Sequence, residues 1–214
     1  MRMHRRDFVG LSLSAVSVAV FGLFMADRSA RAQELAIGRV SRSVGAVSVI
    51  RGGAVQAGAI DAPVSESDQI RTGPDGRAEI TFSDGSVLTV GPDSEVALSA
   101  FAPDPQASNA VIDLLSGIVR VTVNKATEWG RFDVRTSTAV ASVRGTDYLV
   151  EETGAASAVF VAEGRVAVSS RAGAGTVVIR AGQGVDVTGD LAPLVVKTWG
   201  ANRREAALAR VTFP

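Results

Sequence analysis

Apolar side chains recur at every second position along most of the chain after Val44. Clear examples are residues 78–82, 87–90 and 118–123, where β-branched residues alternate with polar ones. A period of two places successive side chains on opposite faces of an extended strand, so each run predicts a short strand with one buried face. Further runs of this kind lie at residues 132–134, 158–161, 166–168 and 177–179.

Turn signals separate these runs at intervals of about 8–12 residues, the spacing of hairpin-built β domains. Asp75-Gly76, Asp84-Gly85 and Glu163-Gly164 are dipeptides of the kind that close tight turns. The spaces between runs are too short for the crossover helices of a parallel sheet. The sequence therefore predicts an all-β domain of short antiparallel strands, and a sandwich, a roll and a β-helical wrap all fit the pattern.

The C-terminal tail departs from the strand pattern. Residues 194–196 are one more strand candidate, and the alanine-rich segment 203–210 predicts a short helix with Asn202 as its N-cap. The tail residues expected to pack against the sheet are Leu208, Val211 and Phe213.

The N-terminus has the three parts of an export signal. Adjacent arginines precede an apolar stretch over residues 8–26, and small residues follow at the positions that a signal peptidase recognises. The arginine pair resembles the bacterial twin-arginine motif, which predicts a signal helix and a periplasmic protein. One alternative is an ordinary secretory signal. Another is a retained membrane anchor, which would be the chain's contact with the membrane. The export motif is assigned to Arg5, Arg6 and Phe8, and the cleavage site to Ala30 and Ala32.

These patterns divide the chain into three parts. Residues 1–32 are the predicted signal peptide, residues 33–190 the β domain, and residues 191–214 a tail with the short helix.

Cleavage after Ala32 changes the chemistry that the chain can carry. It removes His4, the sole histidine, from a chain that has no cysteine. A Ser-His-Asp triad, a cysteine nucleophile and metal sites of imidazole or thiolate are thereby excluded. We therefore predict that the protein is not an enzyme and that it has no cofactor.

Charge gives a second limit on function. With five basic and two acidic residues of the signal removed, 17 basic and 20 acidic residues remain, a net charge of −3. No block of basic residues follows the signal, so we expect no binding to nucleic acid.

An ordered set of short motifs resembles the FecR domain, named after the ferric citrate regulator of bacteria. The set begins at residues 45–51 and 68–73, and continues through the hairpin 76–90. Its strongest piece is Phe132-Asp133-Val134-Arg135-Thr136 followed by Val143-Arg144-Gly145-Thr146-Asp147-Tyr148. Residues 92–96, 163–166 and 181–183 complete the order.

The resemblance, together with the missing catalytic residue types, favours a protein-interaction or sensing role in envelope signalling. Regulators of this family contact a sigma factor through a cytoplasmic segment, but only about six residues precede the apolar stretch here. We therefore expect a free-standing, exported FecR domain that binds an envelope protein. Indirect control of a sigma factor through a membrane-spanning partner is an alternative.

The family motif also supplies candidate site residues, namely Thr136, Arg144, Gly145 and Thr146. In a structural role Gly145 supplies a bend, Thr146 bonds to the local backbone, and Arg144 pairs with an acid such as Asp133 or Asp147. In a binding role Arg144 presents its guanidinium to a carboxylate on a partner.

Two other sets of residues are candidate sites. Trp129 and Arg131 form a candidate binding patch for a cell-envelope glycan, although Trp129 also fits a loop aromatic that caps the core. The acidic turn residues lack the regular spacing of a calcium loop. Those residues are Asp75, Asp84, Asp93 and Glu95.

Overall fold

The computed structural model describes residues 36–103, 108–127 and 129–214. The predicted signal peptide lies outside these residues. The chain divides into residues 1–35 and the compact unit Ala36–Pro214, and the second unit is all-β apart from one helix. The predicted all-β class is confirmed. Among the described residues, none belongs to a helix long and apolar enough to cross a membrane.

Seventeen strands of the described residues form two layers that share one continuous network of strand pairing. Layer A contains, in spatial order, β4 (Pro63–Ser65), β1 (Ala36–Val44), β6 (Arg77–Phe82), β7 (Val87–Val90), the second half of β9 (Asn109–Thr122), β12 (Asp147–Glu152), β13 (Ala156–Glu163), β16 (Gln183–Thr188) and β17 (Lys197–Thr198). Layer B contains β3 (Ala54–Ala57), β2 (Val47–Arg51), β5 (Gln69–Thr72), β8 (Glu95–Ala102), the first half of β9, β10 (Arg131–Arg135), β11 (Ala139–Val143), β14 (Arg165–Ser170) and β15 (Thr176–Arg180).

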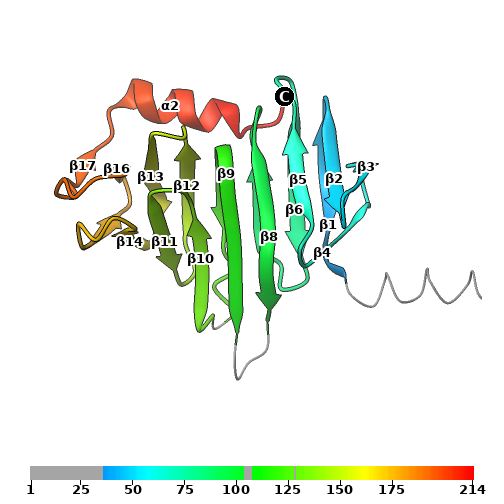
Figure 1. Ribbon diagram of the computed structural model, residues 1–214, viewed down its shortest axis with the longest axis horizontal. Helices are drawn as coiled ribbons and strands as arrows, with labels where there is room; N and C mark the ends of the chain where they lie inside the picture. The colour runs from blue at the N-terminus through cyan, green and yellow to red at the C-terminus, as the bar shows by residue number, and fades with distance from the viewer. Residues whose placement is uncertain (1–35, 104–107, 128) are drawn as a thin grey trace, which may run out of the picture. The chain divides into compact units, whose positions relative to one another are not determined.

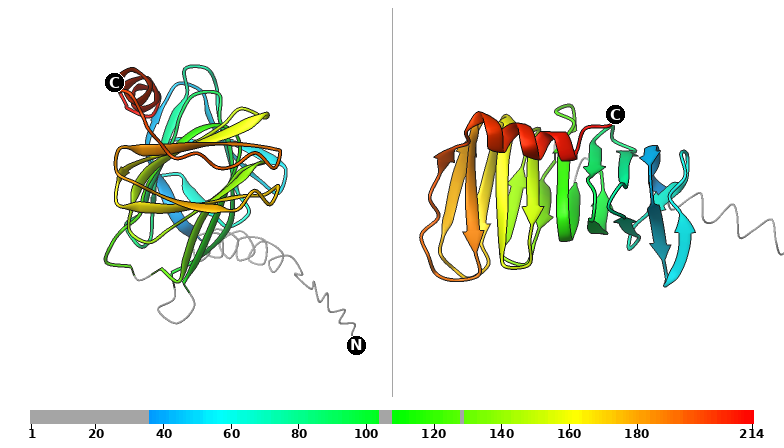
Figure 2. Two further views of the ribbon diagram at one scale, coloured as in Figure 1. Left: turned by 90° about the vertical axis from the view of Figure 1, so that its left-hand side faces the viewer. Right: turned by 90° about the horizontal axis from the view of Figure 1, so that it is seen from above.

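The chain moves between the layers one strand or one hairpin at a time. β10 and β11 lie in layer B, β12 and β13 in layer A, β14 and β15 in layer B, and β16 and β17 in layer A. The end-on view in Figure 2 shows the resulting flattened wrap. The sequence did not decide between a sandwich and a β-helical wrap, and the fold combines the two architectures.

Strand β9 joins the two layers because it bends at Gly117. Its first half pairs with β8 and β10, and its second half pairs with β7 and β12. Gly117 has φ of +89°, and a Cβ atom there would lie 2.1 Å from the Ser94 hydroxyl oxygen. The Ser94 hydroxyl accepts a hydrogen bond from the Ile118 amide at 3.0 Å, which fixes the bend. Only glycine combines this backbone angle with this close approach.

One pairing departs from the predicted antiparallel pattern. β10 runs parallel to the first half of β9, with Phe132 opposite Ala110. The chain has crossed into layer A by the end of β9 and must return to layer B before β10 begins. That return places β10 beside the start of β9 in the same direction.

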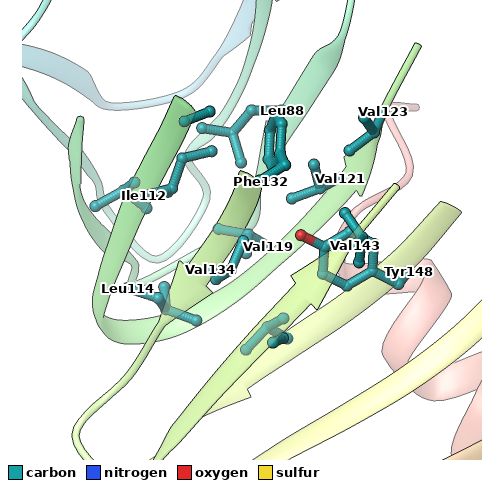
Figure 3. Packing of buried hydrophobic residues seen from close by; sticks show 14 of the residues in the cluster. Leu88, Ile112, Leu114, Val119, Val121, Val123, Phe132, Val134, Val143 and Tyr148 are labelled. Carbon is teal, nitrogen blue, oxygen red and sulfur yellow. The ribbon is translucent and has the colours of Figure 1, made fainter. Parts of the chain in front are cut away.

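The space between the layers is filled by inward-facing side chains from both. Tyr148, Phe132, Ile112 and Leu88 are among the largest fully buried ones (Figure 3). Alternation along β6 and β11 is regular, as the sequence pattern predicts. The runs Tyr148–Val150 in β12 and Val159–Val161 in β13 are buried at every position, so they show no alternation.

Helix α2 (Ala201–Arg210) explains why those strands are buried on both faces. It lies across the outer face of layer A (Figure 1 and, from above, Figure 2). Outward-facing Leu149 and Phe160 pack against the helix and its flanking segments, and Trp199 stacks on Phe160 with ring centroids 4.9 Å apart. Apolar residues on both faces of a strand therefore mark the part of layer A that α2 covers.

Ionic contacts also hold the helix. Arg203 and Arg210 pair with Asp186 and Glu151, and the Arg203 guanidinium lies 3.9 Å from the centre of the Trp199 ring. Hydrogen bonding from Arg203 lowers the pKa of the Asp186 carboxyl below its ordinary value.

The tail differs from its prediction in two respects. Residues 194–196 form no strand, and the helix begins at Ala201 with Gly200 as the N-cap and no side-chain cap. Asn202 therefore lies inside the helix. Val211 is buried and Leu208 packs beside it, as predicted, whereas Phe213 lies under the Arg42 guanidinium at 4.1 Å.

Candidate functional site

An open hollow of about 730 Å³ lies on the outer face of layer B, the face opposite α2. Strands β10, β11, β14 and β15 form its floor. It is lined by Arg131, Asp133, Ser142, Arg144, Arg165, Ala167 and Val178, together with the adjacent Gly130, Phe132, Val143, Gly145 and Gly164. Layer A is covered by a helix in the same region, so the two outer faces of the domain are unequal.

Four arginines lie at one level across the strands of this face. Phe132 pairs with Val143 and Val143 with Val166, so the same registers continued by one residue place Arg131 opposite Arg144 and Arg144 opposite Arg165. Arg165 pairs directly with Arg180 of β15. All four side chains are exposed. We call Arg131, Arg144, Arg165 and Arg180 the arginine row.

Of the described residues that line the hollow, one is acidic, and it is Asp133. Its carboxylate accepts hydrogen bonds from Arg131 Nε at 2.5 Å and from the Ser142 hydroxyl at 2.7 Å, and Arg135 lies 3.8 Å away. These groups cover the carboxylate completely. Asp133 therefore neutralises one arginine of the row and offers no further oxygen to the others.

The remaining arginines of the row have no acidic partner among residues 36–103, 108–127 and 129–214. Arg144 and Arg165 make no side-chain hydrogen bond or ion pair with any part of the chain that the structure describes. Asp147, one predicted partner of Arg144, instead pairs with Arg120 through two bonds of 2.9 and 2.6 Å. The predicted pairing of Arg144 is therefore wrong, and Arg144 is an exposed residue that lines the hollow.

The two residues after Arg144 have structural roles. Gly145 has φ of +68°, a left-handed conformation that glycine adopts without strain, so the predicted bend is present. The Thr146 hydroxyl donates to the Arg165 carbonyl at 3.0 Å. This bond links β14 to the turn after β11, which is a longer-range contact than the local one predicted. Together the two residues hold Arg144 beside Arg165.

Thr136 belongs to a buried polar cluster at the other end of β10. Its hydroxyl lies 2.6 Å from the Ser157 hydroxyl, which donates to Glu152 Oε2 at 2.8 Å. Burial raises the pKa of the Glu152 carboxyl, but hydrogen bonds from Ser157, Gly154 and Ser137 outweigh it and leave that pKa below its ordinary value. The cluster ties hairpins of the two layers together, and its members Thr136, Ser157 and Glu152 are buried.

Trp129 occupies the core rather than the surface. Its side chain is 3% exposed, packs edge-on against Phe101 and Phe132, and donates from Nε1 to Asp84 Oδ2 at 3.0 Å. The prediction that Trp129 and Arg131 form a surface patch is therefore wrong, because the buried indole has no open face for a sugar ring. Arg131 lies instead in the arginine row.

Two of the acidic turn residues, Asp84 and Glu95, make separate structural contacts. Asp84 holds the Ser86 amide and hydroxyl as well as the Trp129 indole, and Glu95 pairs with Arg71. In the described ranges no three or more acidic or histidine side chains gather as a metal-binding group. The export residues Arg5, Arg6, Phe8, Ala30 and Ala32 lie outside the described residues, and their assignment remains a prediction.

The fold and the site define a two-layer β wrap with a helix on one face and a cationic hollow on the other. Comparison with known proteins adds a family. Residues 68–167, slightly less than half of the chain, match the family model described as FecR protein, which agrees with the resemblance in the motif order. The matched residues include β10, β11, Arg144 and Arg165.

Two solved structures share this fold. Both are crystal structures, at 1.65 and 2.50 Å resolution, of a proposed anti-sigma factor from Parabacteroides distasonis ATCC 8503. Each is 19% identical over 65% of this chain, with TM-scores of 0.55 and 0.54. The match covers 64% and 63% of those chains, somewhat less than two thirds. No curated protein sequence matches the chain.

Proposed function

We propose that this protein is a non-catalytic interaction module of bacterial envelope signalling, exported to the periplasm, that binds another protein through the open face of layer B. The observation that carries the proposal is the difference between the two outer faces. α2 covers layer A, whereas the same region of layer B presents a hollow with arginines that have no acidic partner among the described residues. The match to the FecR family model supports a role in signalling.

The hollow has the mixture of groups that protein interfaces use. Guanidinium groups give orientation through hydrogen bonds, and apolar side chains give contact area when water leaves. Val178 is 57% exposed at the rim of the hollow on β15. β15 pairs on one side with β14, and no strand of the described residues has a defined register with its other edge, where a partner could add a strand.

Site-specific photo-crosslinking in intact cells tests this proposal. A photoreactive amino acid replaces Val178 beside the hollow, and a matched variant carries it at Val55 on β3, which is 67% exposed at the other end of layer B. We expect the Val178 variant to capture a defined envelope protein, identified by mass spectrometry, and the Val55 variant not to capture it. Equal products from both positions, or none from Val178, would contradict the proposal.

Control of a sigma factor through a membrane-spanning partner is a second candidate function. It is supported by the match to the FecR family model and by the fold shared with a protein described as an anti-sigma factor. Deletion of the gene should then change a limited set of transcripts, and a copy with intact export should restore them. Unchanged transcripts would dispose of this candidate.

Export by the twin-arginine route is part of the proposal and has its own test. Replacement of Arg5 and Arg6 by lysine removes the paired guanidinium groups and keeps the positive charge. Loss of the processed form from the periplasm is expected. Undiminished export would show that another route carries the protein.

A further inference from the structure

We propose that the arginine row binds a carboxylate-rich segment of the partner protein, with Arg144 and Arg165 as the principal contacts. This inference rests on the proposed function and names the chemistry of the partner. It commits to an acidic protein segment rather than to a membrane or an anionic polysaccharide.

The position of the row is unfavourable for the domain alone. Like charges directly opposite each other on neighbouring strands destabilise a sheet. Arg165 and Arg180 are direct partners, and Arg131, Arg144 and Arg165 continue the line. Only Arg131 of the four has an ion pair, with Asp133, among the described residues. A set of charges that opposes folding is expected where a ligand supplies the missing negative charge.

The chemistry of the row favours carboxylates. A guanidinium donates two parallel hydrogen bonds to one carboxylate, which makes arginine the usual residue for this task. Among the described residues that line the hollow, Asp133 is the acidic one, and it is already engaged by Arg131 and Ser142, so we assign the carboxylates for Arg144 and Arg165 to the partner. Ala167 and Val178 lie beside the row and supply apolar contact, which suits a protein segment better than a simple polyanion.

The spacing of the row indicates how the segment lies. Neighbouring strands are about 4.8 Å apart, so four strands place the arginines over about 14 Å. Along an α-helix, residues three or four apart lie about 4.5–6 Å apart on one face. A helix crossing the strands could therefore present one carboxylate to each arginine in turn. Helix α2 crosses the strands of layer A in this manner, so the fold already accommodates such packing (Figure 2).

A binding experiment with a defined probe tests the inference. The probe is a fluorescein-labelled, alanine-rich helical peptide with glutamates at every third or fourth position of one face, and its matched peptide has glutamine there. The protein is purified after export from the full-length gene. Fluorescence anisotropy should show saturable binding of the glutamate peptide and at least tenfold weaker binding of the glutamine peptide. Equal affinity for the two peptides would overturn the inference.

Charge-reversal variants locate the contact. The double variant Arg144→Glu with Arg165→Glu should weaken binding of the glutamate peptide at least tenfold. The double variant Arg39→Glu with Lys197→Glu makes the same change of net charge at two exposed positions away from the hollow and should leave affinity within about twofold. A loss of the same size in both variants would mean that net charge alone attracts the peptide, which would overturn the assignment of the row.

Thermal unfolding separates a lost contact from a lost fold. A single Arg165→Glu substitution places a negative charge between Arg144 and Arg180, so its melting temperature should be unchanged or higher while peptide affinity falls. A lower melting temperature would show that the row stabilises the domain, which contradicts its role as a site.

Two further arms identify the class of ligand. Vesicles of phosphatidylglycerol and the polysaccharide polygalacturonate carry the same sign of charge without the peptide. If either binds more tightly than the glutamate peptide, and the Arg144→Glu with Arg165→Glu variant abolishes that binding, the row serves a different ligand and the inference fails. The proposed function stands or falls separately, because crosslinking at Val178 detects a protein partner of any charge.

Discussion

Removal of one buried oxygen should stabilise this protein. The Tyr148 side chain is completely buried, and its hydroxyl has no hydrogen-bond partner among the described residues (Figure 3). Burial, with a smaller contribution from the Asp133 carboxylate, raises the pKa of the phenol well above 10, so the group is a neutral hydroxyl at all ordinary pH values. Tyr148→Phe keeps the ring and removes only the unsatisfied group.

The size of the effect follows from the cost of burying a hydroxyl. An unsatisfied buried donor or acceptor costs about 1–3 kcal/mol, and the small void left by the missing oxygen returns part of that. We expect a net gain of about 1 kcal/mol in the free energy of unfolding. For a domain the size of Ala36–Pro214, that gain corresponds to a rise of about 2–4 °C in melting temperature.

A second aromatic substitution provides the matched control. The Trp129 indole is also buried, but its N–H donates to the Asp84 carboxylate at 3.0 Å. Trp129→Phe should cost about 1.5–3 kcal/mol for this hydrogen bond to a charged group, in addition to lost packing. Urea unfolding followed by circular dichroism measures both variants, with the midpoint compared at an unchanged slope.

The reasoning fails if the two variants respond alike. A loss of more than about 1 kcal/mol in Tyr148→Phe, a value typical of a broken hydrogen bond, would show that the hydroxyl is satisfied in the folded protein. A gain in Trp129→Phe would likewise show that the bond to Asp84 contributes nothing.

Three further predictions concern the rest of the fold. Glu152→Gln should destabilise the protein at neutral pH and make its stability less dependent on pH in the acid range. The folded-state pKa of Glu152 lies below its ordinary value of 4.5, so the carboxylate stabilises the fold above about pH 4.5 and loses this effect as the pH falls through the folded pKa. Urea midpoints from pH 7 to pH 3 measure the difference. Trp199→Ala, which removes the stack on Phe160, should cost about 3–5 kcal/mol and increase binding of a hydrophobic dye; an unchanged midpoint would mean that α2 does not stabilise layer A. Gly117→Ala should cost more than about 2 kcal/mol, since the added Cβ meets Ser94 at a positive φ, whereas Gly154→Ala at φ of +85° with open space around it should cost less in the same thermal unfolding measurement.

Local sequence was sufficient for the strands with one face on the core. In β6 and β11 every second side chain faces the other layer, so hydrophobic and polar positions alternate and the pattern alone locates the strand. The run 158–161 was found and lies in β13, but α2 covers the second face of that strand, so its residues are buried without alternation. β12, which is covered in the same way, was not found from a period of two. At residues 194–196 the pattern predicted a strand that does not form, because this apolar run has no neighbouring strand among the described residues to supply its hydrogen bonds.

The candidate site, too, could be predicted only in part from the sequence. The motif around Arg144, Gly145 and Thr146 could be found from sequence, and so could the bend at Gly145, because glycine adopts a left-handed backbone at low cost. The partner of Arg144 could not. Arg120 from β9 takes Asp147, and that competition exists only once β9 and β12 lie side by side.

The sequence by itself therefore determined the all-β class, the hairpin turns and the FecR motif order, since each depends on neighbouring residues and the period of a strand. Tertiary structure alone decided that Trp129 is buried, that α2 covers one layer and that four arginines distant in sequence form a row. Strand register aligns those arginines, and register is set by the packing of whole hairpins against a shared core. A local pattern carries no information about that alignment.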